Sequence, residues 1–126
     1  MPVKRGEIYW VEFDPVKGSE QGGLRPALVV QNDTGNCYSA TTMVAAITRT
    51  LPPQPYPFVV VIEPNESGLP ERSAVNCAQL ATIQQAGPDT RLRPLSGETA
   101  IRPIGQLTSA KMAAVDEALR YNLALK

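Results

Sequence analysis

The stretch Asp14–Asp33, DPVKGSEQGGLRPALVVQND, joins a glycine-bearing polar loop directly to an apolar run. Asp14-Pro15 is a turn signal, and the polar side chains that follow among three glycines are Lys17, Ser19, Glu20 and Gln21. Because Pro26 favours extended backbone for the residue before it, Arg25 is predicted at the start of a strand that continues through Ala27–Val30. Polar side chains on a loop beside a rigid strand are typical of a binding or catalytic site.

The segments around this stretch predict a mainly antiparallel β fold. Residues 7–13 alternate between two sides, as a half-buried strand does, and other apolar segments are bounded by turn residues. The further strands are expected at 41–47, 58–62, 73–78 with a continuation through 80–83, and a short one at 100–104. Residues 32–36 read as a turn cluster, 49–57 as a proline-rich surface loop, and 63–72 and most of 84–105 as loop.

The C-terminal segment predicts one amphipathic helix. Thr108-Ser109 supplies an N-cap, and apolar residues recur at helical spacing at Met112, Val115, Leu119 and Leu123. Short strands followed by one terminal helix predict a small curled antiparallel sheet or barrel with the helix packed on it, in a single domain over residues 1–126. An exposed sheet edge or apolar face in so small a fold favours a dimer.

The composition limits the chemistry. The chain has 12 basic and 12 acidic residues, which counts against a surface tuned throughout for nucleic acid but allows a local basic cleft. It has no histidine, the commonest general acid or base near neutral pH, so any hydrolase chemistry must use carboxylates, arginine, lysine, hydroxyls or cysteine. The chain shows neither an apolar run of about 20 residues nor a signal peptide, so a cytoplasmic protein with no membrane contact is expected.

The two cysteines do not predict a metal site or a disulfide. Cys37 and Cys77 are far apart in sequence, and no histidine is present to complete a zinc site. Reduced thiols are expected, with neither a metal nor a cofactor. Neither thiol has a neighbouring base in the sequence, which disfavours a nucleophilic role.

Arg25 and Thr48 each have an ordinary interpretation, as a surface ion pair and as the last residue of a strand. If the strands that contain them are antiparallel neighbours, however, Arg25 begins one strand where Thr48 ends the other. Both side chains then lie at the same end of the sheet, within reach of one phosphate. The arginine offers a planar fork of N–H donors and the threonine offers a hydroxyl.

Five motifs, in this order, resemble the MazF/PemK (Kid) family of bacterial toxin endoribonucleases. They are GEIYWVEFDP (6–15), GSEQGGLRPALVVQND (18–33), VAAIT (44–48), GLPERSAV (68–75) with Gln79, and IGQLTSAKMAAVDEAL (104–119). The resemblance implies a plasmid-maintenance-toxin fold, which is a strongly curved antiparallel sheet of the SH3-like barrel type with a C-terminal helix. It also implies a homodimer that cuts single-stranded RNA, chiefly mRNA, without a metal. A cognate antitoxin with a disordered acidic segment would inhibit the enzyme by folding over the same groove.

The resemblance also implies roles for individual residues. Arg25 and Thr48 correspond to the family's catalytic pair, the segment Ser19, Glu20 and Gln21 falls in its substrate-facing loop, and Gln79 falls in a base-contacting region. The products would be a 2′,3′-cyclic phosphate and a 5′-hydroxyl. Because arginine has a pKa above about 12, Glu20 is a second candidate for the base beside Arg25.

Two segments, Leu51–Pro57 and Ala86–Arg102, depart from the family pattern, so the RNA sequence that is cut does not follow from the resemblance. Tyr56 in the first of them offers a surface on which a base can stack, unless the segment is a plain loop. Two other functions stay open: a non-enzymatic toxin of the same fold that poisons DNA gyrase, like the CcdB proteins, and a catalytically silent relative. The Arg25-Pro26 block and Thr48 favour the nuclease.

Overall fold

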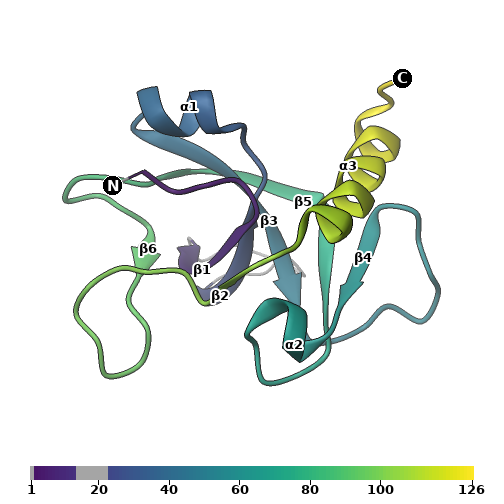
Figure 1. The fold of residues 1–126 in the computed structure, drawn as a ribbon, viewed down its shortest axis with the longest axis horizontal. Coiled ribbons are helices and arrows are strands. Elements are labelled where there is room, and N and C mark those ends of the chain that lie inside the picture. Colours follow the sequence, from purple (N-terminus) through teal and green to yellow (C-terminus); the bar gives the residue numbers. More distant parts are fainter. Residues whose placement is uncertain (1, 14–22) are drawn as a thin grey trace.

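One curved antiparallel sheet runs through the computed structural model, which describes residues 2–13 and 23–126 (Figure 1). Its strands are β1 (Glu7–Phe13), β2 (Gly23–Val29), β3 (Thr41–Thr48), β4 (Val59–Ile62), β5 (Ser73–Gln84), β6 (Leu92–Arg93) and β7 (Gly105–Gln106). They lie in the order β4-β5-β3-β2-β1-β6, and β7 also pairs with β1. Three helices join them, α1 (Asp33–Tyr38), α2 (Pro64–Ser67) and α3 (Ser109–Leu123). The predicted mainly β fold with a C-terminal helix is confirmed.

The structure places the predicted main strands with small changes at their ends. β2 begins at Gly23, four residues before the apolar run, because residues 23–28 pair with β1 even where they are polar. The strand predicted at 100–104 is wrong, and β7 lies just after it. Pro103 has no N–H to donate, so the contact with β1 starts at Ile104, whose N–H donates to the Ile8 carbonyl at 2.7 Å.

Two loops predicted from turn residues contain short helices instead. At the first, the Asn32 side chain accepts a hydrogen bond from the Gly35 N–H at 2.8 Å and so caps α1. At the second, Glu63 and Glu66 form a reciprocal capping box around α2. The same residue types favour turns and helix starts, which is why composition did not separate the two.

The apolar side chains of the sheet divide between two buried clusters. One contains Ile8, Leu28, Ala45, Ile47, Val60, Ile62, Val75, Met112, Val115 and Ala118, among others. The other contains Val3, Tyr9, Val11, Ala27, Val29, Val44, Ile83 and Leu92. Successive residues of β1, β2 and β3 alternate between the clusters because strand side chains alternate between faces. Both faces of the curved sheet are therefore covered.

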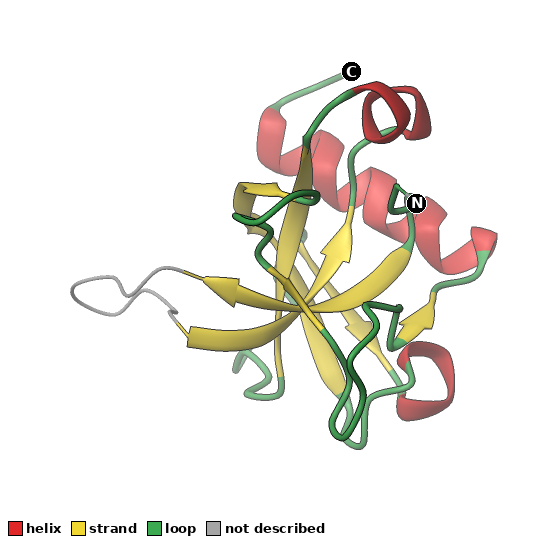
Figure 2. Ribbon diagram, turned by 90° about the vertical axis from the view of Figure 1, so that its left-hand side faces the viewer, coloured by secondary structure: helices red, strands yellow, loops and turns green. Residues whose placement is uncertain are grey.

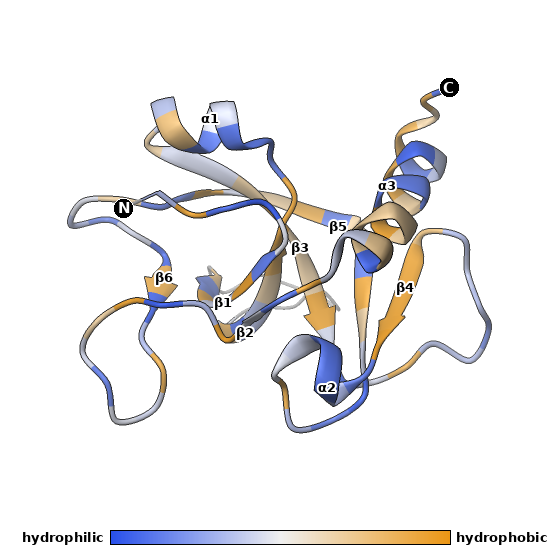
Figure 3. Cartoon of the chain, viewed as in Figure 1, coloured by the Kyte–Doolittle hydropathy of each residue, from blue (hydrophilic) through white to orange (hydrophobic). Residues whose placement is uncertain are grey.

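Helix α3 covers the first cluster and contacts β4 and β5, as Figure 2 shows where the long helix lies across the strands. Met112 and Val115 of the predicted stripe are buried and Leu119 is partly buried. Leu123 is 49% exposed, so this part of the prediction is wrong: the helix extends past the sheet there, and Ala118 is buried instead. Figure 3 shows apolar residues along β4, beside the helix.

Two glycines allow α2 and β7 to lie in contact. A Cβ atom at Gly105 would overlap the carbonyl oxygen of Ser67, and one at Gly68 would lie 2.5 Å from the carbonyl oxygen of Ile104. Both obstacles are backbone atoms, which cannot rotate away. The loop that leads into β5 is thereby held against the strand that precedes α3.

We expect Gly105→Ala to lower the free energy of unfolding by about 1–3 kcal/mol, because a methyl group must be forced against backbone. The measurement is urea unfolding followed by circular dichroism. Gly97→Asn is the control, since that position is open and asparagine tolerates its backbone φ of +80°. Equal losses in the two variants would contradict the close packing described here.

Candidate active site

The pairing of β2 with β3 brings Arg25 and Thr48 to the same end of the sheet. The two strands are antiparallel neighbours, with Ala27 opposite Ala46 and Val29 opposite Val44. The paired residues end at Ala27 and Ala46, and Arg25 and Thr48 lie two residues further along their strands, where the same register would set them opposite each other. Opposed residues of an antiparallel pair project from the same face, so the two side chains share a face. The neighbouring strands that the sequence argument required are present.

Both side chains are half-buried. Thr48 is the last residue of β3, and Arg25 is the third residue of β2. Arg25 lies opposite Val11 in the β1–β2 ladder, in the interior of the sheet rather than at its edge. The Thr48 Oγ1 atom accepts a hydrogen bond from the Thr50 N–H at 3.1 Å. A hydroxyl has one proton and two lone pairs, so this contact orients the oxygen and leaves its O–H to donate.

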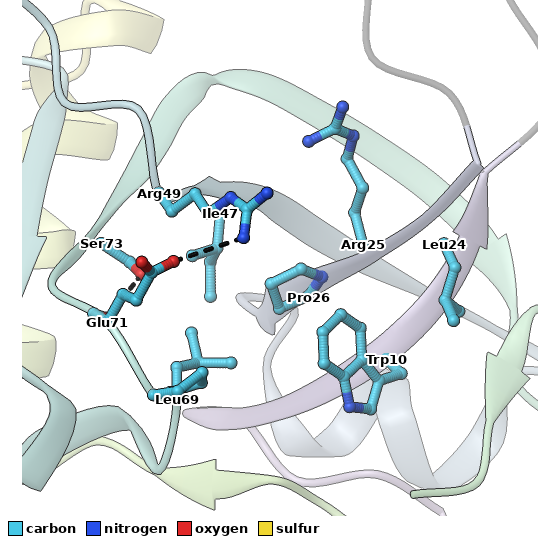
Figure 4. A pocket seen from close by; sticks show the side chains of 10 residues that line it. Trp10, Leu24, Arg25, Pro26, Ile47, Arg49, Leu69, Glu71 and Ser73 are labelled. Carbon is cyan, nitrogen blue, oxygen red and sulfur yellow. Dashed lines mark hydrogen bonds and ion pairs between the residues drawn. The ribbon is translucent and has the colours of Figure 1, made fainter. Parts of the chain in front are cut away.

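A cleft of about 390 Å³ lies beside these strand ends (Figure 4). Its lining residues are Trp10, Leu24, Arg25, Pro26, Ile47, Arg49, Leu69, Pro70, Glu71 and Ser73. Figure 4 shows Trp10 on one side of Pro26 and Arg49 with Glu71 on the other, while the Arg25 guanidinium extends away from the floor. Thr48 is not among the described residues that line the cleft.

The pleat explains this arrangement. Trp10 lies opposite Pro26 in the β1–β2 ladder, and Pro26 shares its face with Ile47 of β3. These side chains form an apolar floor, whereas Arg25 and Thr48 start from the other face. Arg25 is long enough to reach the rim of the cleft from there. The arginine therefore belongs both to the pair with Thr48 and to the cleft.

Three other residues of the cleft, Arg49, Glu71 and Trp10, are not predicted as site residues from the sequence. Arg49 Nη1 lies 3.4 Å from Glu71 Oε2, and the two side chains are 80% and 58% exposed. Arg49 directly follows Thr48 in the sequence, which is the signal that identifies it. Glu71 and Trp10 had no such signal, because only the folded sheet brings residues 10, 49 and 71 to one place.

Gln79 lies where three residues of β5 bulge out of the pairing with β3. Ala45 pairs with Leu80 while the next residue, Ala46, pairs with Asn76, so residues 77–79 have no partner in β3. The Asn76 side chain accepts a hydrogen bond from the Ala78 N–H at 2.9 Å, which fixes the bulge. Gln79 is exposed. Bulges redirect side chains next to active sites, so this geometry fits a contact residue.

The proline-rich loop lies next to this bulge. The Cys77 N–H donates to the Phe58 carbonyl at 2.8 Å. The rings of Tyr56 and Phe58 are stacked, with centroids 5.3 Å apart and planes at 11°. Tyr56 is 37% exposed and thus open on part of its surface. An aromatic pair and the Gln79 amide therefore lie in adjacent segments.

Three of the predicted site residues, Ser19, Glu20 and Gln21, lie outside the described residues. The structure gives no position for them, and the choice between Glu20 and Arg25 as the base stays a prediction. Within residues 2–13 and 23–126, no group of three or more cysteine, aspartate and glutamate side chains is arranged to hold a metal ion. No helix in this part of the chain is long and apolar enough to cross a membrane.

Buried titratable groups do not supply a nucleophile at neutral pH. Burial raises the pKa of the Cys77 thiol to about 11, so the thiol stays protonated. Burial and a hydrogen bond to Glu7 raise the pKa of the Tyr9 phenol well above its usual range, so it also stays neutral. Cys37 is exposed, and both cysteines are free thiols.

The curved sheet with its C-terminal helix defines a fold of the plasmid-maintenance-toxin class, and known proteins agree. Residues 4–123 match the family described as PemK-like, MazF-like toxin of type II toxin–antitoxin system. The chain is 39% identical over 125 residues to endoribonuclease EndoA of Bacillus subtilis, covering 99% of this chain and 97% of that protein.

Solved structures show the same fold. The toxin MazF-mt6 of Mycobacterium tuberculosis matches with a TM-score of 0.72 and 22% identity, over 95% of this chain and 98% of that one. A mycobacterial endoribonuclease solved in complex with its cognate antitoxin matches with a TM-score of 0.70 and 25% identity, over 98% and 97%. The chain belongs to the PemK-like, MazF-like toxin family of type II toxin–antitoxin systems, a family of endoribonucleases.

We expect a thiol reagent at pH 8 to modify Cys37 rapidly and Cys77 only after denaturation. The raised pKa of Cys77 keeps its thiol protonated until the pH approaches about 11, and burial also blocks access. Counting modified thiols by mass spectrometry with and without guanidinium measures this. Labelling of both thiols at equal rates in the native protein would contradict the burial of β5.

Proposed function

We propose that this protein is the toxin of a type II toxin–antitoxin system. It cuts single-stranded RNA, chiefly mRNA, at a short sequence and without a metal, and this cleavage inhibits translation and growth. The main supporting observation is the pairing of β2 and β3, which sets Arg25 and Thr48 at one end of the sheet. Membership of the family and the 39% identity to an endoribonuclease support the same reaction.

The reaction is an attack of a ribose 2′-hydroxyl on the neighbouring phosphorus. The new O–P bond gives a 2′,3′-cyclic phosphate. The bond to the 5′-oxygen breaks, and that oxygen takes a proton from water and leaves as a 5′-hydroxyl. Arg25 places its N–H groups against the negative charge that grows on the phosphoryl oxygens, and Thr48 donates its O–H to one of them.

The proton of the 2′-hydroxyl goes to Arg25 or Glu20. A carboxylate accepts a proton readily at neutral pH, whereas a guanidinium is already protonated there and must first lose a proton. The sequence has no histidine, so the commonest general base near neutral pH is absent. Glu20 is therefore the group whose replacement most directly separates the two routes.

Recognition uses unpaired bases. Bases in single strands turn outward, so side chains reach their hydrogen-bonding edges, and the 2′-hydroxyl distinguishes RNA from DNA. The exposed Gln79 amide on its bulge contacts such an edge, and Ser19, Glu20 and Gln21, in the segment before β2, hold the substrate. Tyr56, stacked on Phe58, supplies a surface for a base.

The protein works in the cytoplasm as a homodimer with an antitoxin as its regulator. Exposed apolar side chains near the end of α3, at Tyr121, Leu123 and Leu125, supply surface for association. The antitoxin contributes a disordered acidic segment that folds over the RNA-binding groove, where Arg25 and Arg49 complement its charge. A related mycobacterial endoribonuclease solved with its cognate antitoxin supports such a partner.

We expect the purified protein to cut a long single-stranded RNA at discrete sites in excess EDTA, and Arg25→Ala to slow this cleavage by about 10²–10³-fold, because one preorganised donor is lost from the transition state. Gel electrophoresis of timed samples measures the rates. Arg120→Ala, on the exposed face of α3, is the control for the loss of one positive charge and should cut at the normal rate. Intact RNA together with inhibition of DNA gyrase would contradict the proposal and favour the gyrase poison.

We expect Gln79→Ala to change which sites are cut more than how fast RNA is cut, since its amide reads a base and does not touch the scissile phosphate. Sequencing the 5′-hydroxyl ends from a mixed transcript pool measures the preference at each position. Each lost base contact should reduce discrimination at one position by roughly 1–3 kcal/mol, by analogy with base readout in DNA. An unchanged set of sites would show that Gln79 does not contact a base.

A further inference from the structure

We infer that the cleft beside Arg25 binds one nucleotide of the RNA, with its base on Trp10 and its phosphate on Arg49. Arg49 gives up its ion pair with Glu71 when it binds this phosphate. This inference rests on the proposed RNA cleavage and adds two residues, Trp10 and Arg49, that hold the substrate. The observations that carry it are the floor of the cleft, its charges and the geometry of its ion pair.

The floor suits a flat, partly apolar ligand. Trp10 and Pro26 lie opposite each other in the β1–β2 ladder, and Ile47 and Leu69 complete the apolar lining. Stacking of a base on an aromatic side chain contributes about 1–3 kcal/mol, and it does not require a particular base. The volume of about 390 Å³ lies near the lower limit for small-molecule sites, which fits one nucleotide rather than a longer stretch of RNA.

The charges suit an anion. Among the described residues that line the cleft, Arg25 and Arg49 are positively charged and Glu71 is negatively charged. Arg49 directly follows Thr48 in the sequence, and Arg25 reaches the rim on the other side of Pro26 (Figure 4). Arg25 belongs both to the pair with Thr48 and to the cleft, so an RNA strand whose cut phosphate lies on Arg25 can place its neighbouring nucleotide over the cleft. Arg49 is then placed to bind the phosphate of that nucleotide.

The ion pair between Arg49 and Glu71 is weak enough to be replaced. Its N–O distance is 3.4 Å and both side chains are largely exposed, and such pairs contribute about 0–1 kcal/mol. A guanidinium binds a phosphate with two parallel N–H donors, which is a stronger contact than one long ion pair. Glu71 thus competes with the RNA for Arg49 and slightly lowers the affinity of the protein for RNA.

The two partners of this ion pair should therefore act in opposite directions. For a short RNA with one cut site, assayed in EDTA, we expect Arg49→Gln to raise KM by about tenfold or more, because a charge-assisted hydrogen bond is lost. Glu71→Gln should lower KM by up to about fivefold, because it frees Arg49 from a weak pair. In both variants kcat should change much less than KM.

The exposed pair Arg120 and Glu117 on α3 provides the matched control. Arg120→Gln and Glu117→Gln change the net charge in the same ways and should each leave KM within about twofold. A rise of KM in both Arg49→Gln and Glu71→Gln would show that their ion pair only supports the loop, and would overturn the inference. Wild-type protein that fails to cut RNA would instead refute the proposed function.

Trp10 is the one tryptophan of the sequence, so intrinsic fluorescence reports on the cleft directly. The probe is the same RNA with a 2′-deoxy sugar at the cut site, which binds but is not cleaved. We expect it to quench the fluorescence, with weaker binding in Arg49→Gln and tighter binding in Glu71→Gln. An unchanged signal with saturating RNA would overturn the inference. If the signal then changed with a peptide of the acidic antitoxin type, the cleft would be assigned to the antitoxin.

Discussion

The pairing of β2 with β3 is the contact on which the site depends. It fixes Ala27 opposite Ala46, and the residues at the same end of both strands follow from that register. A shift of one residue would turn Arg25 and Thr48 to opposite faces, because strand side chains alternate. Such a shift would also move Leu28 and Val29 out of their two clusters. The apolar core and the site are therefore specified by the same pairing.

In the proposed reaction, position and charge at the strand ends assist whichever of Glu20 and Arg25 takes the proton. The sequence has no histidine, so a reaction at phosphorus must be assisted by donors held where negative charge develops. Rigid strand ends hold such donors with little reorganisation, and the hydrogen bond from the Thr50 N–H orients the Thr48 oxygen further. Under the proposed function, the surrounding cleft and bulge bind the RNA, and Arg25 and Thr48 act on the phosphate.

Much of this arrangement follows from the sequence because its signals are local. Alternation predicts the main strands. The positions of Arg25 and Thr48 predict the pair only if their strands are antiparallel neighbours, which the β2–β3 pairing supplies. What the sequence does not give depends on contacts across the fold. The bulge that exposes Gln79 arises from the β3–β5 register, and the Arg49–Glu71 pair joins residues 22 apart. The strand expected at 100–104 shows the same limit, since Pro103 delays pairing with β1 until Ile104.

The central claim is that Arg25 and Thr48 act as one unit on one phosphate, and a double-mutant cycle tests it most directly. Single-turnover cleavage rates of Arg25→Ala, Thr48→Val and the double variant would be compared with the wild type, with folding checked by circular dichroism. Residues that act as a unit are strongly non-additive, so the double variant should be about as slow as Arg25→Ala alone. Losses that simply multiply would show two independent residues and contradict the account.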